Sequence, residues 1–123
     1  MTIAADGSTA NQGFTDWRPL VRIALGDLPC LGDVAAVYAI RSRDGKVLYI
    51  GSTKNLRNRL FKNYIGGTGG ETTMRIHRLL FAQGHIAEVE FAWLETGKYR
   101  QMEEELKQNY REKHGQLPRW TRR

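Results

Sequence analysis

The stretch VLYIGSTKNLRNRLFKN, at positions 47–63, combines a tyrosine with a run of cations. Its first four residues are β-branched, aromatic or apolar, which is typical of a buried strand. After Gly51 the pattern predicts a helix that either Ser52 or Thr53 can cap. That helix carries no acid and four cations, which are Lys54, Arg57, Arg59 and Lys62. A strand that delivers Tyr49 beside a basic helix is suited to a phosphate ligand.

Three consecutive glutamates lie in a segment, residue 99 to about residue 113, whose apolar residues recur at helical spacing. At about 100° per residue, Glu103 falls beside Tyr110 at the border of the apolar face, whereas the next two glutamates lie off that face. A carboxylate on a buried face costs free energy unless it has a partner. A metal ion or Arg59 would supply that partner. The alternative is an ion pair with Lys107, four residues further on.

Two tyrosine tripeptides complete this pattern: Ala36-Val37-Tyr38 and Tyr49-Ile50-Gly51. Arg59 follows ten residues after the second tyrosine, and a leucine stands three residues after Glu103. Over roughly residues 34–120 the chain resembles the GIY-YIG nuclease domain, with alanine in place of the first glycine. A second departure is Thr121, which stands where the family usually has an asparagine shortly after a proline.

The resemblance implies a metal-dependent endonuclease that hydrolyses phosphodiester bonds in DNA. Glu103 would hold one divalent ion, Mg²⁺ or Mn²⁺, beside the leaving oxygen. Arg59 would stabilise charge on the phosphate, and either Tyr38 or Tyr49 would take a proton from water. Because the pKa of a free tyrosine is about 10, we expect Arg59, Lys54 and the metal to lower it.

Six further side chains are candidates for contact with the substrate: Ser52, Lys54, Arg57, Lys62, Arg75 and His77. The cations of the first helix are either contacts to the phosphate backbone or solvated charges. His77 lies in a second predicted helix, residues 71–83. Family members often carry a histidine four residues after the helix arginine, where this chain has Asn63. His77 is therefore either a substitute in space or a structural residue.

The two tyrosines are expected on one face of a hairpin. Predicted strands at residues 34–41 and 46–50 flank an Asp-Gly turn at 42–45. A four-residue loop pairs residue 41 with 46, and therefore Tyr38 with Tyr49. Facing residues of a ladder point to the same side, so the phenols lie close together unless a bulge intervenes. The alternative is two core tyrosines that only fill the sheet.

The predicted fold class is α/β (α+β), with a small three-stranded, mainly antiparallel sheet flanked by helices. The third strand covers residues 86–94, where apolar and acidic residues alternate. We expect a flexible tail at residues 1–13, then an extension at 14–33 with a helix over 14–25 and a loop. The GIY-YIG-like domain would cover residues 34–123, and its glycine-rich stretch at 65–70 is not a P-loop.

Composition limits the cellular setting and the partners. The formal net charge of +6 favours a polyanion, most commonly nucleic acid, although a basic domain without such a partner is the alternative. The single cysteine, Cys30, excludes an internal disulfide framework and fits a cytoplasmic location. We expect no membrane association, because no apolar run has transmembrane length and the N-terminus lacks signal-peptide features.

Two other function classes stay open beside the endonuclease. The first is a catalytically impaired nucleic-acid-binding module of the same fold, which the threonine at position 121 motivates. The second is a protein-interaction or regulatory domain whose charge serves solubility. The choice between DNA and RNA, the strandedness of the substrate and the oligomeric state are also left open.

Overall fold

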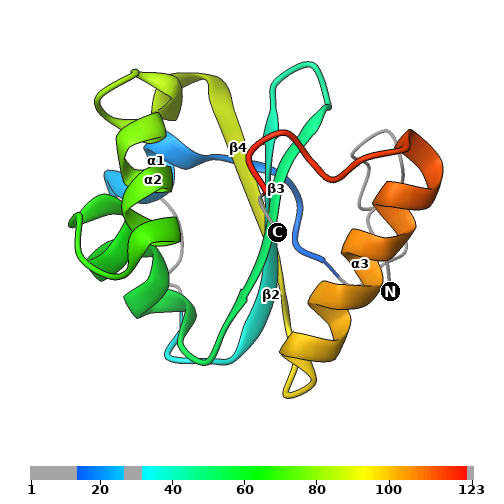
Figure 1. The fold of residues 1–123 in the computed structure, drawn as a ribbon. Coiled ribbons are helices and arrows are strands. Elements are labelled where there is room, and N and C mark those ends of the chain that lie inside the picture. The colour runs from blue at the N-terminus through cyan, green and yellow to red at the C-terminus, as the bar shows by residue number, and fades with distance from the viewer. Residues whose placement is uncertain (1–13, 27–31, 122–123) are drawn as a thin grey trace.

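Four antiparallel strands form the central sheet, in the order β1-β4-β2-β3 (Figure 1). The structure, a computed structural model, describes residues 14–26 and 32–121. The inner strands are β4 (Val89–Glu95) and β2 (Ala36–Ser42), and the edge strands are β3 (Val47–Thr53) and the two-residue β1 (Arg18–Pro19). The predicted antiparallel sheet is confirmed, with four strands in place of three. The predicted tail and Cys30 lie outside the described residues.

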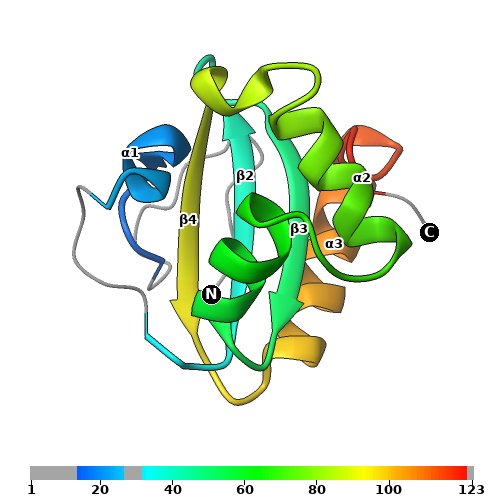
Figure 2. The same cartoon turned by 90° about the vertical axis from the view of Figure 1, so that its left-hand side faces the viewer.

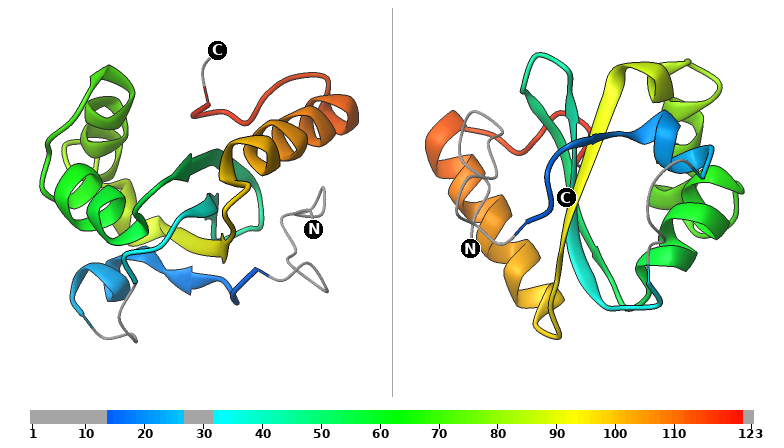
Figure 3. Two further views of the ribbon diagram at one scale, coloured as in Figure 1. Left: turned by 90° about the horizontal axis from the view of Figure 1, so that it is seen from below. Right: turned by 180° about the vertical axis from the view of Figure 1, so that it is seen from behind.

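Helices cover both faces of the sheet (Figures 1 and 2). One layer contains α1 (Leu20–Ala24), η1 (Asn58–Ile65) and α2 (Glu71–Leu80), and the opposite layer contains α3 (Tyr99–His114). A single 3₁₀ turn, η2 (His85–Glu88), leads into β4. The views from below and from behind show the same three layers (Figure 3). No helix in the described part of the chain is long and apolar enough to cross a bilayer.

Each face of the sheet has its own apolar core. On the side of η1 and α2, Tyr38 of the sheet packs in one cluster with Leu60. On the side of α3, Val37 and Ile50 pack with Leu106. Because side chains alternate along a strand, neighbouring residues of β2 serve opposite cores, as do Tyr49 and Ile50 of β3. The helices on both sides therefore hold the strands that carry the candidate site.

The β2–β3 hairpin is shifted by two residues from the predicted register. Its loop contains only residues 43–45, and the last of them, a glycine, has a φ of 96° that suits the end of a three-residue loop. Leu48 is an extra residue on β3, because the register shifts there. Tyr38 therefore faces Gly51 and not Tyr49. From Tyr49 onward the shift is two residues, which leaves these side chains on their predicted face. Between the loop and the bulge the shift is one residue, so Val47 lies in the core under α3, opposite to Tyr49.

The predicted helix over residues 14–25 is wrong for its first half. The first described residues are extended beside β4, where the Thr15 N–H donates to the Trp93 carbonyl at 2.9 Å. Only Leu20–Ala24 form α1. The edge of β4 offers backbone hydrogen bonds that a short isolated helix cannot match. The segment thus places Phe14 in the core under α3 and Leu20 in the core under η1.

Candidate active site

Three tyrosine rings meet on the η1 side of β2 and β3. Tyr38 and Tyr49 have ring centroids 6.3 Å apart, and Tyr64 of η1 lies 6.0 Å from the first ring and 6.5 Å from the second. The hydroxyl oxygens of Tyr38 and Tyr64 are 2.5 Å apart and share a hydrogen bond. The prediction that Tyr38 and Tyr49 share one face is confirmed. We call these three residues the tyrosine cluster.

Gly51 makes the close approach of the two strand tyrosines possible. A Cβ atom at this position would lie 2.7 Å from the Tyr38 hydroxyl oxygen and 2.8 Å from a ring carbon of Tyr49. Both distances are shorter than carbon atoms tolerate, so any side chain at position 51 would displace a ring. The glycine of the Tyr-Ile-Gly tripeptide is therefore needed because its missing side chain leaves room for the rings of Tyr38 and Tyr49.

Gly51 does not end the strand, as the sequence had suggested, because β3 continues to Thr53. The helix begins after Asn55, whose side-chain oxygen accepts a hydrogen bond from the Asn58 N–H at 3.0 Å. Asn55 is thus the helix cap, and the predicted caps Ser52 and Thr53 lie in the strand. In consequence, the Ser52 side chain is available to the opposite face of the sheet.

Tyr64 is a residue of the site that the sequence prediction missed. That prediction examined Asn63, four residues after Arg59, but the Asn63 amide donates to the Thr68 carbonyl at 3.0 Å. η1 is π-helical, with backbone hydrogen bonds that span five residues, so the tyrosine five residues after Arg59 faces the sheet instead. The available signal was an apolar stripe at helical spacing, formed by Leu56, Leu60 and Tyr64, which puts this tyrosine on the buried face of the helix.

The Arg59 guanidinium lies half-buried beside the tyrosine cluster. Its carbon is 6.0 Å from the Tyr64 ring centroid. Its Nε is buried and has no hydrogen-bond partner among the described residues. Burial alone lowers the pKa of Arg59, but the neighbouring tyrosine oxygens outweigh burial, and the net pKa is raised. Arg59 is therefore a fixed positive charge with an unused donor.

Burial raises the pKa of all three phenols in the tyrosine cluster. For the two strand tyrosines, the Arg59 charge acts in the opposite direction, and the Glu103 charge adds to the increase. The prediction that Arg59 lowers these pKa values is confirmed in direction, but burial exceeds this effect and the net pKa of both tyrosines is raised. The cluster is neutral at physiological pH.

Glu103 projects from α3 and has two partners. One carboxylate oxygen accepts a hydrogen bond from the Ser52 hydroxyl of β3. The other pairs with the Lys107 ammonium, so the ion pair considered as an alternative is present. The side chains of Glu103 and Lys107 are only 19% and 14% exposed, which makes this pair stronger than an ordinary surface pair. Among the described residues, no three His, Cys, Asp or Glu side chains lie close enough together to hold a metal ion between them.

The tyrosine cluster and Glu103 lie on opposite faces of the sheet, and β3 contributes Tyr49 to the first face and Ser52, which holds Glu103, to the second. In the part of the chain that the structure describes, β3 is an edge strand with no further strand beside it. Gly51 belongs to the face that carries Tyr38, and the next residue, Ser52, belongs to the α3 face, where it holds Glu103. The edge of β3 near these two residues is therefore where groups from both layers can reach one ligand.

The remaining predicted contacts lie away from this point or serve the fold. Arg75 donates to the Trp120 carbonyl at 2.6 Å, and His77 Nδ1 lies 2.6 Å from the Tyr64 carbonyl oxygen. His77 therefore supports the end of η1 and does not enter the tyrosine cluster. Three predicted phosphate contacts are exposed, as such a role requires: Lys54, Arg57 and Lys62.

A comparison with protein families decides the relationship. The family model described as the GIY-YIG catalytic domain matches residues 34–116. The chain belongs to the GIY-YIG catalytic domain family. The resemblance noted in the sequence is thereby confirmed, and the matched range includes Tyr38, Tyr49, Arg59 and Glu103.

Two curated relatives of this GIY-YIG domain are much longer proteins. UvrABC system protein C of Anaplasma marginale (strain St. Maries) is 37% identical over 73 residues, which is 59% of this chain and 11% of the relative. UvrABC system protein C of Trichlorobacter lovleyi is 36% identical over 62 residues, which is 50% of this chain and 9% of the relative. This chain thus spans about a tenth of the length of the curated relatives it matches.

Solved structures of the GIY-YIG N-terminal endonuclease domain of UvrC from Thermotoga maritima are also similar. A tyrosine-to-phenylalanine variant is 22% identical with a TM-score of 0.50, and the match covers 82% of this chain and 97% of that one. An asparagine-to-alanine variant is 25% identical with a TM-score of 0.48, covering 84% and 93%. Both are described as bound to a catalytic divalent cation. The first likeness shows that the fold is shared.

Proposed function

We propose that this chain is a metal-dependent endonuclease domain that hydrolyses phosphodiester bonds in DNA. Membership of the GIY-YIG catalytic domain family supports a catalytic role. The description of the Thermotoga maritima domain as an endonuclease supports the reaction. The net charge of +6 supports a polyanionic substrate.

The unused donor of Arg59 is the observation that carries this proposal. A buried N–H group without a partner costs about 1–3 kcal/mol. A phosphate oxygen at the edge of β3 would provide the missing acceptor and would be attracted by the fixed positive charge. Arg59 then stabilises the negative charge that grows on the phosphate oxygens during hydrolysis.

The residues at the edge of β3 fit a hard divalent cation. Glu103 offers carboxylate oxygens, and Mg²⁺ is commonly held by one or two carboxylates together with waters and substrate phosphates. Glu103 would hold the ion, while the Ser52 hydroxyl orients the carboxylate. Such an ion, when bound, neutralises the leaving oxygen as a Lewis acid. Lys107 must then give up one of the two oxygens.

Tyr49 is the better placed of the two candidate bases. Tyr38 is fully buried, and its hydroxyl is paired with Tyr64, whereas Tyr49 keeps 8% of its surface exposed. Neutralisation of Glu103 removes one contribution that raises the pKa of Tyr49. To act as a base, the neutral Tyr49 phenol first releases its own proton to solvent, and its oxygen then takes a proton from the attacking water as the water oxygen bonds to phosphorus. The bond from phosphorus to the leaving oxygen breaks, and that oxygen takes a proton from solvent.

The test is cleavage of labelled single-stranded, double-stranded and branched DNA with Mg²⁺, Mn²⁺ or EDTA. Wild type is compared with Arg59→Ala and Glu103→Gln, each beside a matched control on the surface. Arg43→Ala removes an exposed arginine of the hairpin loop, and Glu104→Gln removes the exposed neighbouring carboxylate. We expect metal-dependent cutting that both site variants abolish and both controls keep. Cutting that survives in both site variants contradicts the assignment of the site.

The internal pairing of Glu103 favours one second candidate function. Both of its oxygens already have partners, and the phenols are neutral. A nucleic-acid-binding module that does not cut would keep this arrangement permanently. Binding with a steep salt dependence but no cleavage in any metal would support that alternative.

A further inference from the structure

The last described residues cover part of the open edge of β3. The Trp120 N–H donates to the Leu48 carbonyl at 2.7 Å, and the Ile50 N–H donates to the Thr121 hydroxyl at 3.3 Å. Trp120 and Thr121 are both buried. Residues 118–121, which we call the C-terminal segment, therefore contact β3 on either side of Tyr49.

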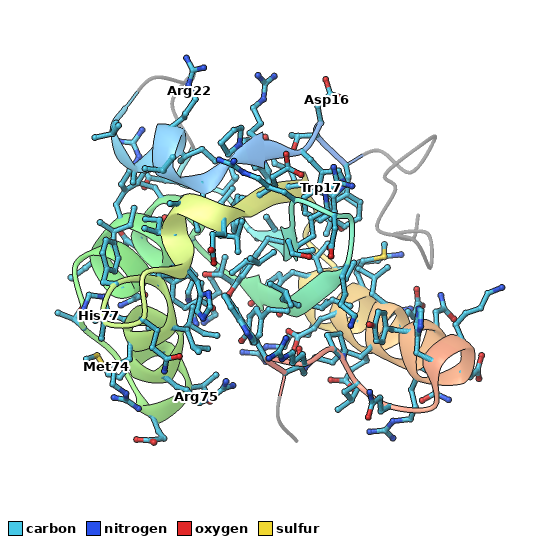
Figure 4. All side chains as sticks on the ribbon, turned by 90° about the horizontal axis from the view of Figure 1, so that it is seen from above. Asp16, Trp17, Arg22, Met74, Arg75 and His77 are labelled. Atoms are coloured by element: carbon cyan, nitrogen blue, oxygen red, sulfur yellow. The ribbon has the colours of Figure 1, made fainter. Side chains whose placement is uncertain are left out.

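Arg75 connects this segment to the helical layer. Its guanidinium donates to the Trp120 carbonyl at 2.6 Å. In Figure 4, Arg75 extends from α2 on the side of the C-terminal segment, whereas Arg22 extends away from the body of the protein. The residue that the sequence suggested as a substrate contact is thus directed at the backbone of its own chain. Its neighbour Arg78, on the same helix, is exposed.

We propose that Arg75 is a positioning residue that holds the C-terminal segment on β3 and thereby fixes Tyr49. β2 holds Tyr49 from one side, where it faces Ile40. On the other side, the bonds that the described residues make to the β3 backbone around Tyr49 are those of Trp120 and Thr121. The bulge at Leu48 lies directly before Tyr49, and an extra residue weakens the ladder locally. The C-terminal segment supports β3 at the place where its own pairing is poorest.

This role differs physically from contact with a phosphate. A phosphate contact contributes to binding of any sequence and to its salt dependence. A positioning residue leaves binding unchanged and affects the chemical step, because small misplacements of a reacting group are costly. Only the effect on the chemical step rests on the proposed function. The support that Arg75 gives to β3 is independent of the proposed function.

Amide hydrogen exchange of the full chain tests the structural part. The reporters are the N–H groups of Ile50 and Trp120, compared between Arg75→Met and Arg78→Met. We expect exchange at both reporters to become at least about tenfold faster in Arg75→Met and to stay unchanged in Arg78→Met. Arg75→Lys should restore part of the protection, since an ammonium can also donate to the Trp120 carbonyl.

Thr121→Val provides a second variant that leaves Arg75 intact. It removes the acceptor of the Ile50 N–H, so exchange at Ile50 should rise, whereas Thr121→Ser should keep it slow. If Ile50 and Trp120 exchange at the wild-type rate in Arg75→Met, the proposal is overturned, whatever the domain does to DNA. If Arg75→Met does not fold, faster exchange at Ile50 in Arg75→Lys supports the proposal, and wild-type exchange overturns it.

DNA binding and cleavage test the functional part. We expect Arg75→Met to bind DNA with the wild-type Kd and salt slope while kcat falls by about ten- to a hundredfold. A higher Kd with a salt slope smaller by about one would assign Arg75 to the phosphate backbone and overturn the proposal. If wild type does not cut DNA, the proposed function fails, and the exchange data still decide the role of Arg75.

Discussion

Replacement of Gly51 by alanine tests the packing of the site most directly. The new Cβ would lie 2.7 Å from the Tyr38 hydroxyl oxygen, whereas ordinary contact begins at 3.4 Å. The oxygen must therefore retreat by roughly 0.7 Å to restore contact distance. Tyr38 has no room to do so, because it is fully buried, stacked on Phe91 and bonded to Tyr64.

We expect this overpacking to cost about 1–3 kcal/mol of unfolding free energy. For a domain of this size, each kcal/mol lowers Tm by roughly 3–6 °C. Cleavage should fall by about a hundredfold if Tyr38 or Tyr49 moves by roughly 1 Å. The assay is thermal unfolding followed by circular dichroism, with cleavage measured below the transition.

Gly97→Ala is the matched control, because a Cβ there meets nothing within 4 Å. It should change the unfolding free energy by less than about 0.5 kcal/mol. The combination of Gly51→Ala with Tyr38→Phe should recover only part of the loss, since ring atoms remain within 2.8 Å. If Gly51→Ala melts at the same temperature as Gly97→Ala, the steric reasoning is refuted.

Three further outcomes follow from the same contacts. Burial raises the pKa of the three phenols of the tyrosine cluster in the folded state, so these phenols lose their protons first in the unfolded chain. The free energy of unfolding should therefore fall above about pH 10, by up to about 1.4 kcal/mol per pH unit for each phenol. Phenolate absorbance and urea unfolding from pH 8 to 11 check this, and early ionisation of the whole cluster in the native protein would contradict it. Lys107→Met frees one Glu103 oxygen, so the Mg²⁺ concentration that half-maximally raises Tm should fall by about three- to tenfold, an effect that Glu103→Gln should abolish. Leu20→Ala should cost about 2–5 kcal/mol, measured by urea unfolding, because this side chain is fully buried, whereas Leu25→Ala, at 73% exposure, should be nearly neutral.

For Tyr38 and Tyr49, the sequence predicted the shared face of the sheet correctly but not the residue that each one pairs with on the neighbouring strand. The shared face of Tyr38 and Tyr49 depends only on the parity of the register, which a shift of two residues does not change. Their pairing depends on loop length and on a bulge at Leu48, and neither is encoded in the alternation of apolar residues. The sequence could therefore indicate that the rings share a face, but not that Tyr38 lies over Gly51.

Tyr64 and Arg75 show a different limit of prediction from the sequence. The apolar stripe of the helix indicates that Tyr64 is buried, but its hydrogen bond to Tyr38 joins residues 26 apart in sequence and depends on the tertiary fold. The partner of Arg75 is a carbonyl 45 residues away in sequence, and only the tertiary fold brings the two together. Charge alone suggested a phosphate contact, because a free guanidinium and one that supports a backbone segment look alike in sequence.

The location of the site at a sheet edge explains how it can be both rigid and open. Buried tyrosines and a carboxylate on opposite faces can reach the same ligand only where no further strand intervenes, which limits the site to β3. An open edge is also the least supported part of a sheet. The C-terminal segment supports this edge at Leu48 and Ile50, beside the bulge, and its described hydrogen bonds to β3 do not extend to Ser52. The edge near Ser52 and Glu103 therefore stays available to a substrate, while the backbone of Tyr49 is held from both sides.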